Sequence, residues 1–280
     1  MALIWGSSFL FTELSLRFLP FYGVAFWRTF LGGLAMFALV FLLKLQRPKG
    51  TQWFHLWVAG VLMSAIPFSL FSFAQQSTTS SLAAIIGAAT PMFTLLAILT
   101  IYRTEKVTVV ATLGLLIGLV GVAITLGVWE GFGNNDPLAI AALVLATISY
   151  GIGGPYIRKF VTPMNLSGTS TAAAQVFTSA LTLLPFYLFS GPLITASPSI
   201  ESLLSIIALG VLGSGFAYRL FHDVIKDAGS TVASTVTFTN PVVATIWGIL
   251  LLSEELHWYE PIGGLVVILG AWLAQHKATK

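Results

Sequence analysis

The chain has 280 residues, of which 56% are hydrophobic and only 8% carry charged side chains. Soluble domains average about 25% charged residues, so a chain of this size with so little charge could not cover a surface that faces water. It contains no cysteine, which excludes disulfides and thiolate metal sites. The composition therefore predicts an integral membrane protein that has the lipid bilayer as a partner and no nucleic acid.

Apolar stretches long enough to cross a bilayer recur along the whole sequence. A spanning helix needs about 20 mostly apolar residues, whereas a transmembrane barrel strand alternates apolar and polar positions. These stretches are apolar on every face, so the expected fold class is an all-α integral membrane protein with ten transmembrane helices. The expected spans are residues 2–19, 21–44, 53–75, 80–101, 108–128, 137–159, 166–190, 202–224, 229–252 and 258–276.

The basic residues predict how these spans are oriented, because Lys and Arg concentrate in cytoplasmic loops. If both termini are cytoplasmic, only Arg17 and Arg28 lie in the outer half of the membrane. The basic residues on the inner side are then Lys44, Arg47, Lys49, Arg103, Lys106, Arg158, Lys159, Arg219, Lys226, Lys277 and Lys280. We therefore expect a multi-pass protein of the cell inner (plasma) membrane with cytoplasmic N- and C-termini.

The second half of the chain repeats the first. With a shift of 150 residues, residues 60–115 align with 210–265 without a gap, and Pro91 meets Pro241. A shared apolar composition is the alternative explanation, but it does not account for an ungapped register that also aligns rare residues. The sequence therefore predicts an internal repeat.

The expected repeats are residues 1–130 and 131–280, which together form one transport domain. Each holds five spans, and because five is odd, the halves must cross the membrane in opposite senses. Inverted repeats are typical of secondary transporters, whose substrate site lies near the midplane between the halves. A channel or a membrane scaffold is the alternative.

Short motifs at the starts and middles of the spans carry a resemblance to a known family. They are Trp5-Gly6-Ser7-Ser8-Phe9, Ala25-Phe26-Trp27-Arg28, Ala89-Thr90-Pro91, Thr239-Asn240-Pro241, Glu105 and Glu254-Glu255. In order and spacing they resemble the drug/metabolite transporter superfamily, in its ten-helix EamA branch, and the chain is similar to the YddG-type amino-acid exporters. The resemblance implies an exporter of small metabolites, often amino acids. The halves differ, because Tyr150-Gly151 stands in place of Trp5-Gly6 and no Arg in span 166–190 answers Arg28.

Polar and aromatic residues form stripes on several expected spans and are candidates for substrate binding. Ser64, Phe68, Phe71 and Gln75 share one face of span 53–75 at helical spacing. Polar groups avoid lipid, so this face is expected to point inward, although packed or lipid-facing phenylalanines are the alternative. The remaining candidates are Trp5, Ser8, Trp27, Arg28, Thr90, Phe93, Tyr150, Tyr156, Ser214, Tyr218, Asn240 and Trp247.

Prolines and glycines mark expected hinges. Pro91 and Pro241 free the carbonyls of Gly87 and Thr237, four residues earlier. At membrane depth such carbonyls need protein, water or substrate as a partner, and the alternative is a purely structural kink. The run Gly153, Gly154 and Pro155 makes span 137–159 the weakest helix, and we expect a hinge or an unwound cavity wall there.

Three charges lie in the outer half of the membrane: Glu13, Arg17 and Arg28. Isolated charges are costly there, so Glu13 is expected to pair with Arg17 or Arg28. Such a pair can be structural. It can also be functional, with Arg28 holding a substrate carboxylate or Glu13 carrying a proton.

These features predict a secondary transporter that exports neutral or aromatic amino acids by alternating access. Its cavity is expected near the midplane, between the first, third, fourth, sixth, eighth and ninth spans, with Trp27 and Arg28 facing inward. A transporter of another metabolite, such as a nucleotide sugar or a drug-like compound, is the first alternative and a membrane-embedded enzyme is the second. No enzyme motif or paired-His metal pattern is present in the sequence, so no enzymatic activity, cofactor or metal is expected.

Overall fold

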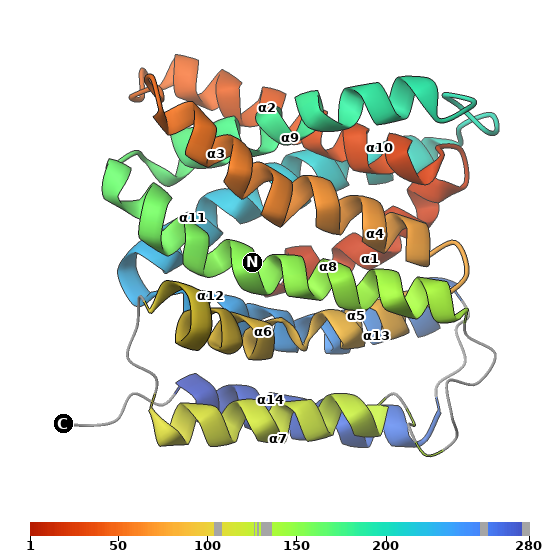
Figure 1. The fold of residues 1–280 in the computed structure, drawn as a ribbon. Helices are drawn as coiled ribbons and strands as arrows, with labels where there is room; N and C mark the ends of the chain where they lie inside the picture. The colour runs from red at the N-terminus through yellow and green to blue at the C-terminus, as the bar shows by residue number, and fades with distance from the viewer. Residues whose placement is uncertain (104–107, 126, 128, 130–135, 253–256, 276–280) are drawn as a thin grey trace.

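The computed structural model describes residues 1–280 except 104–107, 126, 128, 130–135, 253–256 and 276–280 (Figure 1). Helices dominate, and the described residues contain no strand. Seven helical stretches, some built from several segments, are long and apolar enough to cross a membrane, and three shorter apolar helices accompany them. The fold is therefore the all-α membrane architecture that the sequence predicts.

The described part of the first half of the chain contains nine helical segments. They are α1 (Ala2–Leu16), α2 (Phe21–Leu42), α3 (Gln52–Gly60), η1 (Val61–Ala65), α4 (Ile66–Ala74), α5 (Ser80–Gly87), α6 (Thr90–Ala97), η2 (Ile98–Tyr102) and α7 (Val109–Thr125). The described part of the second half contains α8 (Pro137–Tyr156), η4 (Ile157–Val161), η5 (Thr162–Met164), α9 (Gly168–Phe189), α10 (Ile200–Ala208), η6 (Leu209–Phe216), α11 (Ala217–Ala228), α12 (Ser230–Ser234), η7 (Thr235–Thr239), α13 (Asn240–Leu252) and α14 (Tyr259–Gln275).

Several spans are interrupted α-helices. The π-helical turns η1 and η6 lie inside the third and eighth spans, and such turns are frequent at functional sites. The fourth span breaks between α5 and α6, just before Pro91, and the ninth passes through the 3₁₀ segment η7 just before Pro241. Each interruption lies in the middle of a membrane-spanning stretch.

The sixth span is not unwound at its glycines, although an unwound cavity wall was one of the two structures expected there. Gly153, Gly154 and Pro155 lie within the continuous helix α8, and the departure from α geometry comes after them, in the π-helical turn η4. The glycines instead allow close packing: a Cβ at Gly153 would lie 2.7 Å from Cγ of Met63. A run of glycines in a membrane helix often marks a contact with a neighbour rather than an unwound segment.

The helices α7 and α14 pack side by side along one edge of the bundle, apart from the layers that hold the other helices (Figure 1). Their outward faces are apolar and exposed, as at Leu116 and Leu265. The largest buried cluster lies at the other side, where α2, α3, α9 and α11 meet. Helix α2 approaches η6 so closely that a Cβ at Gly32 would lie 2.6 Å from the carbonyl oxygen of Gly210.

Candidate functional site

A cavity of about 80 Å³ lies inside the bundle. Its wall is built from α1, α2, η1, α4, α5, α6, α8, α11, α12, η7 and α13, so every expected cavity span contributes. The lining residues are Trp5, Ser8, Phe9, Thr12, Arg28, Met63, Phe68, Phe71, Gln75, Gly87, Thr90, Thr94, Tyr150, Gly154, Tyr218, Phe221, Ser230, Ser234, Thr237 and Asn240.

Arg28 supplies the positive charge of this cavity. The residue is only 5% exposed, and its position on α2 places it against η6. Its Nε donates a hydrogen bond to Ser214 Oγ (3.1 Å), and its Cζ lies 3.5 Å from the centroid of the Phe68 ring. A guanidinium held flat against an aromatic face keeps its charge while its orientation is fixed.

Two tyrosines complete the surroundings of Arg28. Tyr150 on α8 and Tyr218 on α11 lie close enough to interact electrostatically with the guanidinium, and their hydroxyls also interact with each other. Tyr218 is 1% exposed, and its hydroxyl donates to the main-chain carbonyl of Met63. The cavity thus gathers one cation and two hydroxyls from three different spans.

Asn240 supplies a free acceptor. It is 7% exposed at the start of α13, and its Oδ1 has no hydrogen-bond partner within the described part of the chain. A buried amide oxygen without a partner is costly, about 1–3 kcal/mol. Because Asn240 lines the cavity, a donor group on a bound molecule can offset that cost.

Most small hydroxyls of the wall present oxygen lone pairs to the cavity, since their protons are used within their own helices. The bonds are Ser8 to Ile4 O (2.9 Å), Thr12 to Ser8 O (2.8 Å), Thr90 to Gly87 O (2.6 Å), Thr94 to Thr90 O (3.0 Å), Ser234 to Thr231 O (2.8 Å) and Thr237 to Ser234 O (2.8 Å). A hydroxyl that donates in this way can still accept. Away from Arg28, the wall is therefore suited to a ligand that donates hydrogen bonds.

Aromatic rings form the apolar part of the wall. Trp5 lies 5.5 Å from Tyr218 and 5.3 Å from Phe221, and Phe9 lies 5.7 Å from Phe71, all measured between ring centroids. Edge-to-face and tilted contacts of this kind hold rings in place. The cavity can therefore receive an apolar group next to its polar ones.

The carbonyls freed by the two expected hinge prolines have their partners within the protein, which is one of the three kinds of partner expected for them. Gly87 O accepts the Thr90 hydroxyl, and Thr237 O accepts the amide of Asn240 in the 3₁₀ segment η7. The tighter turn of a 3₁₀ helix offers an i+3 donor where proline removes the i+4 donor.

The structure brings together ten of the predicted binding residues and separates six. The ten that line the cavity are Trp5, Ser8, Arg28, Phe68, Phe71, Gln75, Thr90, Tyr150, Tyr218 and Asn240. Gly154, predicted as a hinge, also lines it, whereas Pro91, Gly153, Pro155 and Pro241 do not. The six that lie outside the lining are Trp27, Ser64, Phe93, Tyr156, Ser214 and Trp247.

The outlying residues have other contacts. Trp27 does not face inward as expected, because its indole donates to the Tyr187 hydroxyl (3.2 Å) between α2 and α9. Tyr156 bonds with His55 (2.7 Å), and Trp247 donates to Ser7 Oγ (2.9 Å). Ser64 accepts from Gln175 and Ser214 accepts from Arg28, so both serines support the wall from behind.

Sequence reasoning missed part of the wall. Phe9 lies about one helical turn beyond Trp5, and Ser234 precedes Asn240 by six residues. Helical spacing from a proposed site residue was the signal that could have found them. Met63, Thr94 and Ser230 are other cavity residues absent from the prediction.

Glu13 and Arg17, two of the three charges expected in the outer half of the membrane, differ in burial. Glu13 is half-buried on α1 and Arg17 follows that helix as an exposed residue. Glu105, Glu254 and Glu255, which carry part of the family resemblance, lie outside the described residues.

Comparison with known proteins identifies related chains. Residues 1–127 and 137–274 match the EamA-like transporter family. An uncharacterized transporter of Archaeoglobus fulgidus is 26% identical over 98% of this chain and 94% of its own length. The uncharacterized inner membrane transporter YedA of Escherichia coli (strain K12) is 25% identical over 97% of this chain and 87% of its own.

Two further similarities are more distant. PecM of Dickeya dadantii is 24% identical over 81% of this chain and 75% of its own. A solved crystal structure has the same fold, with a TM-score of 0.75 at 17% identity, covering 98% of this chain and 93% of the other.

Proposed function

The chain belongs to the EamA-like transporter family and is a multi-pass membrane transporter, and from that premise we propose that it is a secondary transporter that exports neutral amino acids through the central cavity. One observation carries the proposal. A single cavity holds a buried guanidinium, at Arg28, and a buried acceptor without a partner, at Asn240 Oδ1.

The carboxylate of the amino acid binds at Arg28 in this proposal. The guanidinium is fixed by Ser214 and Phe68, and the hydroxyls of Tyr150 and Tyr218 lie nearby. Charge-assisted bonds from Arg to a carboxylate are among the stronger hydrogen bonds in proteins. Phosphate-bearing substrates such as nucleotide sugars would call for several cations, and among the lining residues that the structure describes Arg28 is the one Lys or Arg.

The ammonium group of the amino acid binds at Asn240. The Oδ1 acceptor has no competing donor within the described part of the chain. The lone pairs of Thr90 and Thr237, whose protons point to their own helices, add acceptors around it. An ammonium has three donors and no acceptor, so it matches this part of the wall.

The side chain of the amino acid rests against the aromatic wall of Trp5, Phe71 and Phe221. One water needs about 10–15 Å³ of such a cavity, so a volume of about 80 Å³ takes roughly six waters. An aliphatic amino acid such as leucine fits that space, whereas an aromatic one requires the wall to expand. We therefore place aliphatic neutral amino acids before aromatic ones.

The proposed mechanism is alternating access between two inverted halves, residues 1–130 and 131–280, with the hinge prolines Pro91 and Pro241 at matching places. Residues 130–135, at their junction, lie outside the described residues.

We place the protein in the cell inner membrane with both termini cytoplasmic, as the distribution of basic residues favours. The relative YedA is named as an inner membrane protein, which supports this location.

Transport by the purified protein in liposomes tests the proposal. Vesicles loaded with one unlabelled amino acid are diluted into a panel of radiolabelled amino acids without ATP, and counterflow is recorded for each. We expect uptake of leucine, isoleucine, valine or threonine above that of protein-free vesicles, and no uptake of the corresponding amines, which lack a carboxylate. Strict dependence on ATP, or equal uptake of amines and amino acids, would overturn the proposal.

A further inference from the structure

Two main-chain carbonyls in the membrane interior are related by the internal repeat. Met63 lies in the π-helical turn η1, and Gly213, 150 residues later, lies in the π-helical turn η6. The shift of 150 is the one that aligns residues 60–115 with 210–265. The two carbonyls therefore hold equivalent positions in the third and eighth spans.

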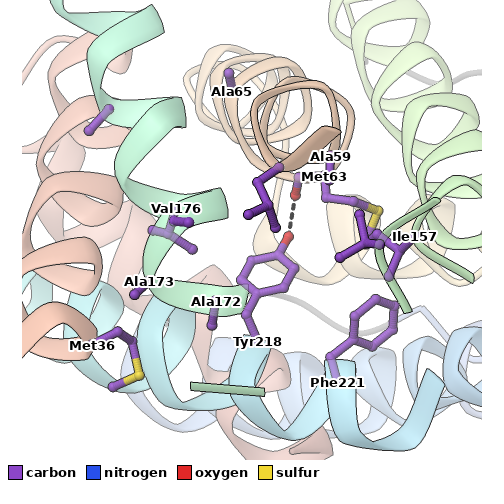
Figure 2. Packing of buried hydrophobic residues seen from close by; sticks show 14 of the residues in the cluster. Met36, Ala59, Met63, Ala65, Ile157, Ala172, Ala173, Val176, Tyr218 and Phe221 are labelled. Atoms are coloured by element: carbon purple, nitrogen blue, oxygen red, sulfur yellow. Dashed lines mark hydrogen bonds between the residues drawn. The ribbon is translucent and has the colours of Figure 1, made fainter. Parts of the chain in front are cut away.

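The Met63 carbonyl cannot receive the usual bond from its own helix. Its α-helical donor would be the residue four positions later, which is Pro67 and has no amide hydrogen. The hydroxyl of Tyr218, on α11, donates to it instead, and Figure 2 shows this bond above the buried ring of Phe221. A side chain from the second half of the chain thus bonds the main chain of the first half.

The Gly213 carbonyl makes the reciprocal contact. The indole Nε1 of Trp5, on α1, donates to it at 2.9 Å. Here a side chain from the first half bonds the main chain of the second. The rings of Trp5 and Tyr218 also touch, with centroids 5.5 Å apart at an interplanar angle of 67°, so the two side chains that make these bonds are in direct contact.

We propose that Trp5 and Tyr218 are positioning residues that form two matched latches, each closing one half of the transporter onto a repeat-related carbonyl of the other. Both bonds exist in the conformation of this structure, so both stabilise it against the alternative conformation. An unpartnered carbonyl at membrane depth is costly, and the latches therefore set how often the halves separate. Because both aromatics line the cavity, the latches lie beside the proposed substrate site.

The inference rests on the alternating access proposed above, but it does not depend on which substrate is carried. The absence of cysteine from the chain allows single cysteines to report access without background. Thr12→Cys and Ser234→Cys place reporters on two cavity-lining positions, on α1 and α12. A membrane-impermeant maleimide is added to right-side-out or inside-out vesicles, and the ratio of the two labelling rates measures the conformational equilibrium.

Tyr218→Phe removes only the hydroxyl, and the repeat-related residue, Phe68, is already a phenylalanine. Trp5→Phe removes the indole N–H, and Trp5→Tyr, which gives the residue type of Tyr150, is the second variant if the first does not fold. We expect each variant to change the labelling ratio about fivefold or more, in the same direction. The effects should be non-additive in the double variant because the two rings touch.

Trp27→Phe is the matched control. It also removes an indole bond between helices, to Tyr187, but outside the cavity lining. Thermal unfolding in detergent measures stability, and we expect the control to lose stability without moving the labelling ratio. If the reporters are labelled from both sides but the Trp5 and Tyr218 variants leave the labelling ratio unchanged, the latches alone are overturned. The same holds if the two variants shift the ratio in opposite directions. Labelling from one side only in every protein would overturn alternating access, and the latches with it.

Discussion

Arg28 and Gln175 each donate a hydrogen bond to the same repeat-related serine position, but in opposite halves of the chain. Arg28 Nε donates to Ser214 Oγ at 3.1 Å, and Gln175 Nε2 donates to Ser64 Oγ at 3.4 Å. Ser64 and Ser214 are 150 residues apart. The halves thus share a contact geometry between neighbouring helices while only one of them places a charge at the cavity.

Replacement of Arg28 tests the role of that charge. Arg28→Gln introduces the residue type of Gln175, an uncharged side chain that already donates to the repeat-related serine, Ser64, in this fold. A charge-assisted hydrogen bond is worth about 1.5–3 kcal/mol, and we expect amino-acid affinity to fall roughly ten- to 150-fold. Substrate-induced thermal stabilisation measures the change. A variant with unaltered affinity for amino acids would place the carboxylate elsewhere.

Asn240→Ala removes the acceptor proposed for the ammonium group. Loss of one well-placed buried polar contact costs about 1–3 kcal/mol, or roughly five- to 150-fold in affinity. Counterflow in liposomes should therefore require much higher amino-acid concentrations, while the protein still folds. Leu116→Ala, at a position that is 50% exposed on α7, is the control and should transport as the unmodified protein does. Equal transport by both variants would contradict the assignment.

The contact between α7 and α14 predicts opposite outcomes for two glycines of one helix. A Cβ at Gly270 would lie 2.6 Å from Cα of Gly118 and 2.6 Å from the carbonyl oxygen of Gly114, whereas a Cβ at Gly264 would meet nothing within 4 Å. Gly270→Ala should destabilise by about 1–3 kcal/mol through overpacking. Gly264→Ala should be neutral, or stabilising by up to about 1 kcal/mol through helix propensity. Thermal unfolding in detergent compares them.

The orientation inferred from the basic residues is tested by reporters. A reporter fused after Lys280, or inserted in loops 45–52 and 102–107, should give a cytoplasmic signal, because Lys and Arg are concentrated in those segments. Paired fusions of alkaline phosphatase and green fluorescent protein distinguish the two sides. A periplasmic signal at either loop would contradict the arrangement of five spans in each half.

The fold was largely predictable because long apolar stretches and short polar connections encode membrane helices directly. Much of the cavity was predictable too, since polar residues such as Asn240 and Gln75 avoid lipid and so mark inward faces. Trp27 shows the limit of that reasoning. An aromatic side chain beside an inward-facing Arg28 can equally bond a neighbouring helix, here through Tyr187, and composition does not distinguish the two.

The interior bonds of the helices were the part that the sequence did not reveal. The carbonyls freed by Pro91 and Pro241 were expected to find a partner in protein, water or substrate, and in the structure a hydroxyl and a 3₁₀ amide satisfy them. Pro67 leaves the Met63 carbonyl without its α-helical donor, and the Tyr218 hydroxyl takes that place. Pro67 was not singled out from the sequence because it lies near no expected break. Which donor reaches a freed carbonyl depends on tertiary packing, and no local pattern records it.

Because of Pro67, the carbonyls of Met63 and Gly213 differ in the hydrogen-bond donors available to them within their own helices. In the second half, the residue four positions after Gly213 is Ala217, whose amide hydrogen can bond Gly213 if η6 relaxes to an α-helix. In the first half that return to α geometry is closed, because Pro67 has no amide hydrogen to give. At Met63 the third span therefore needs a donor other than its own α-helical amide, such as the Tyr218 hydroxyl, whereas the eighth span can supply the equivalent donor itself.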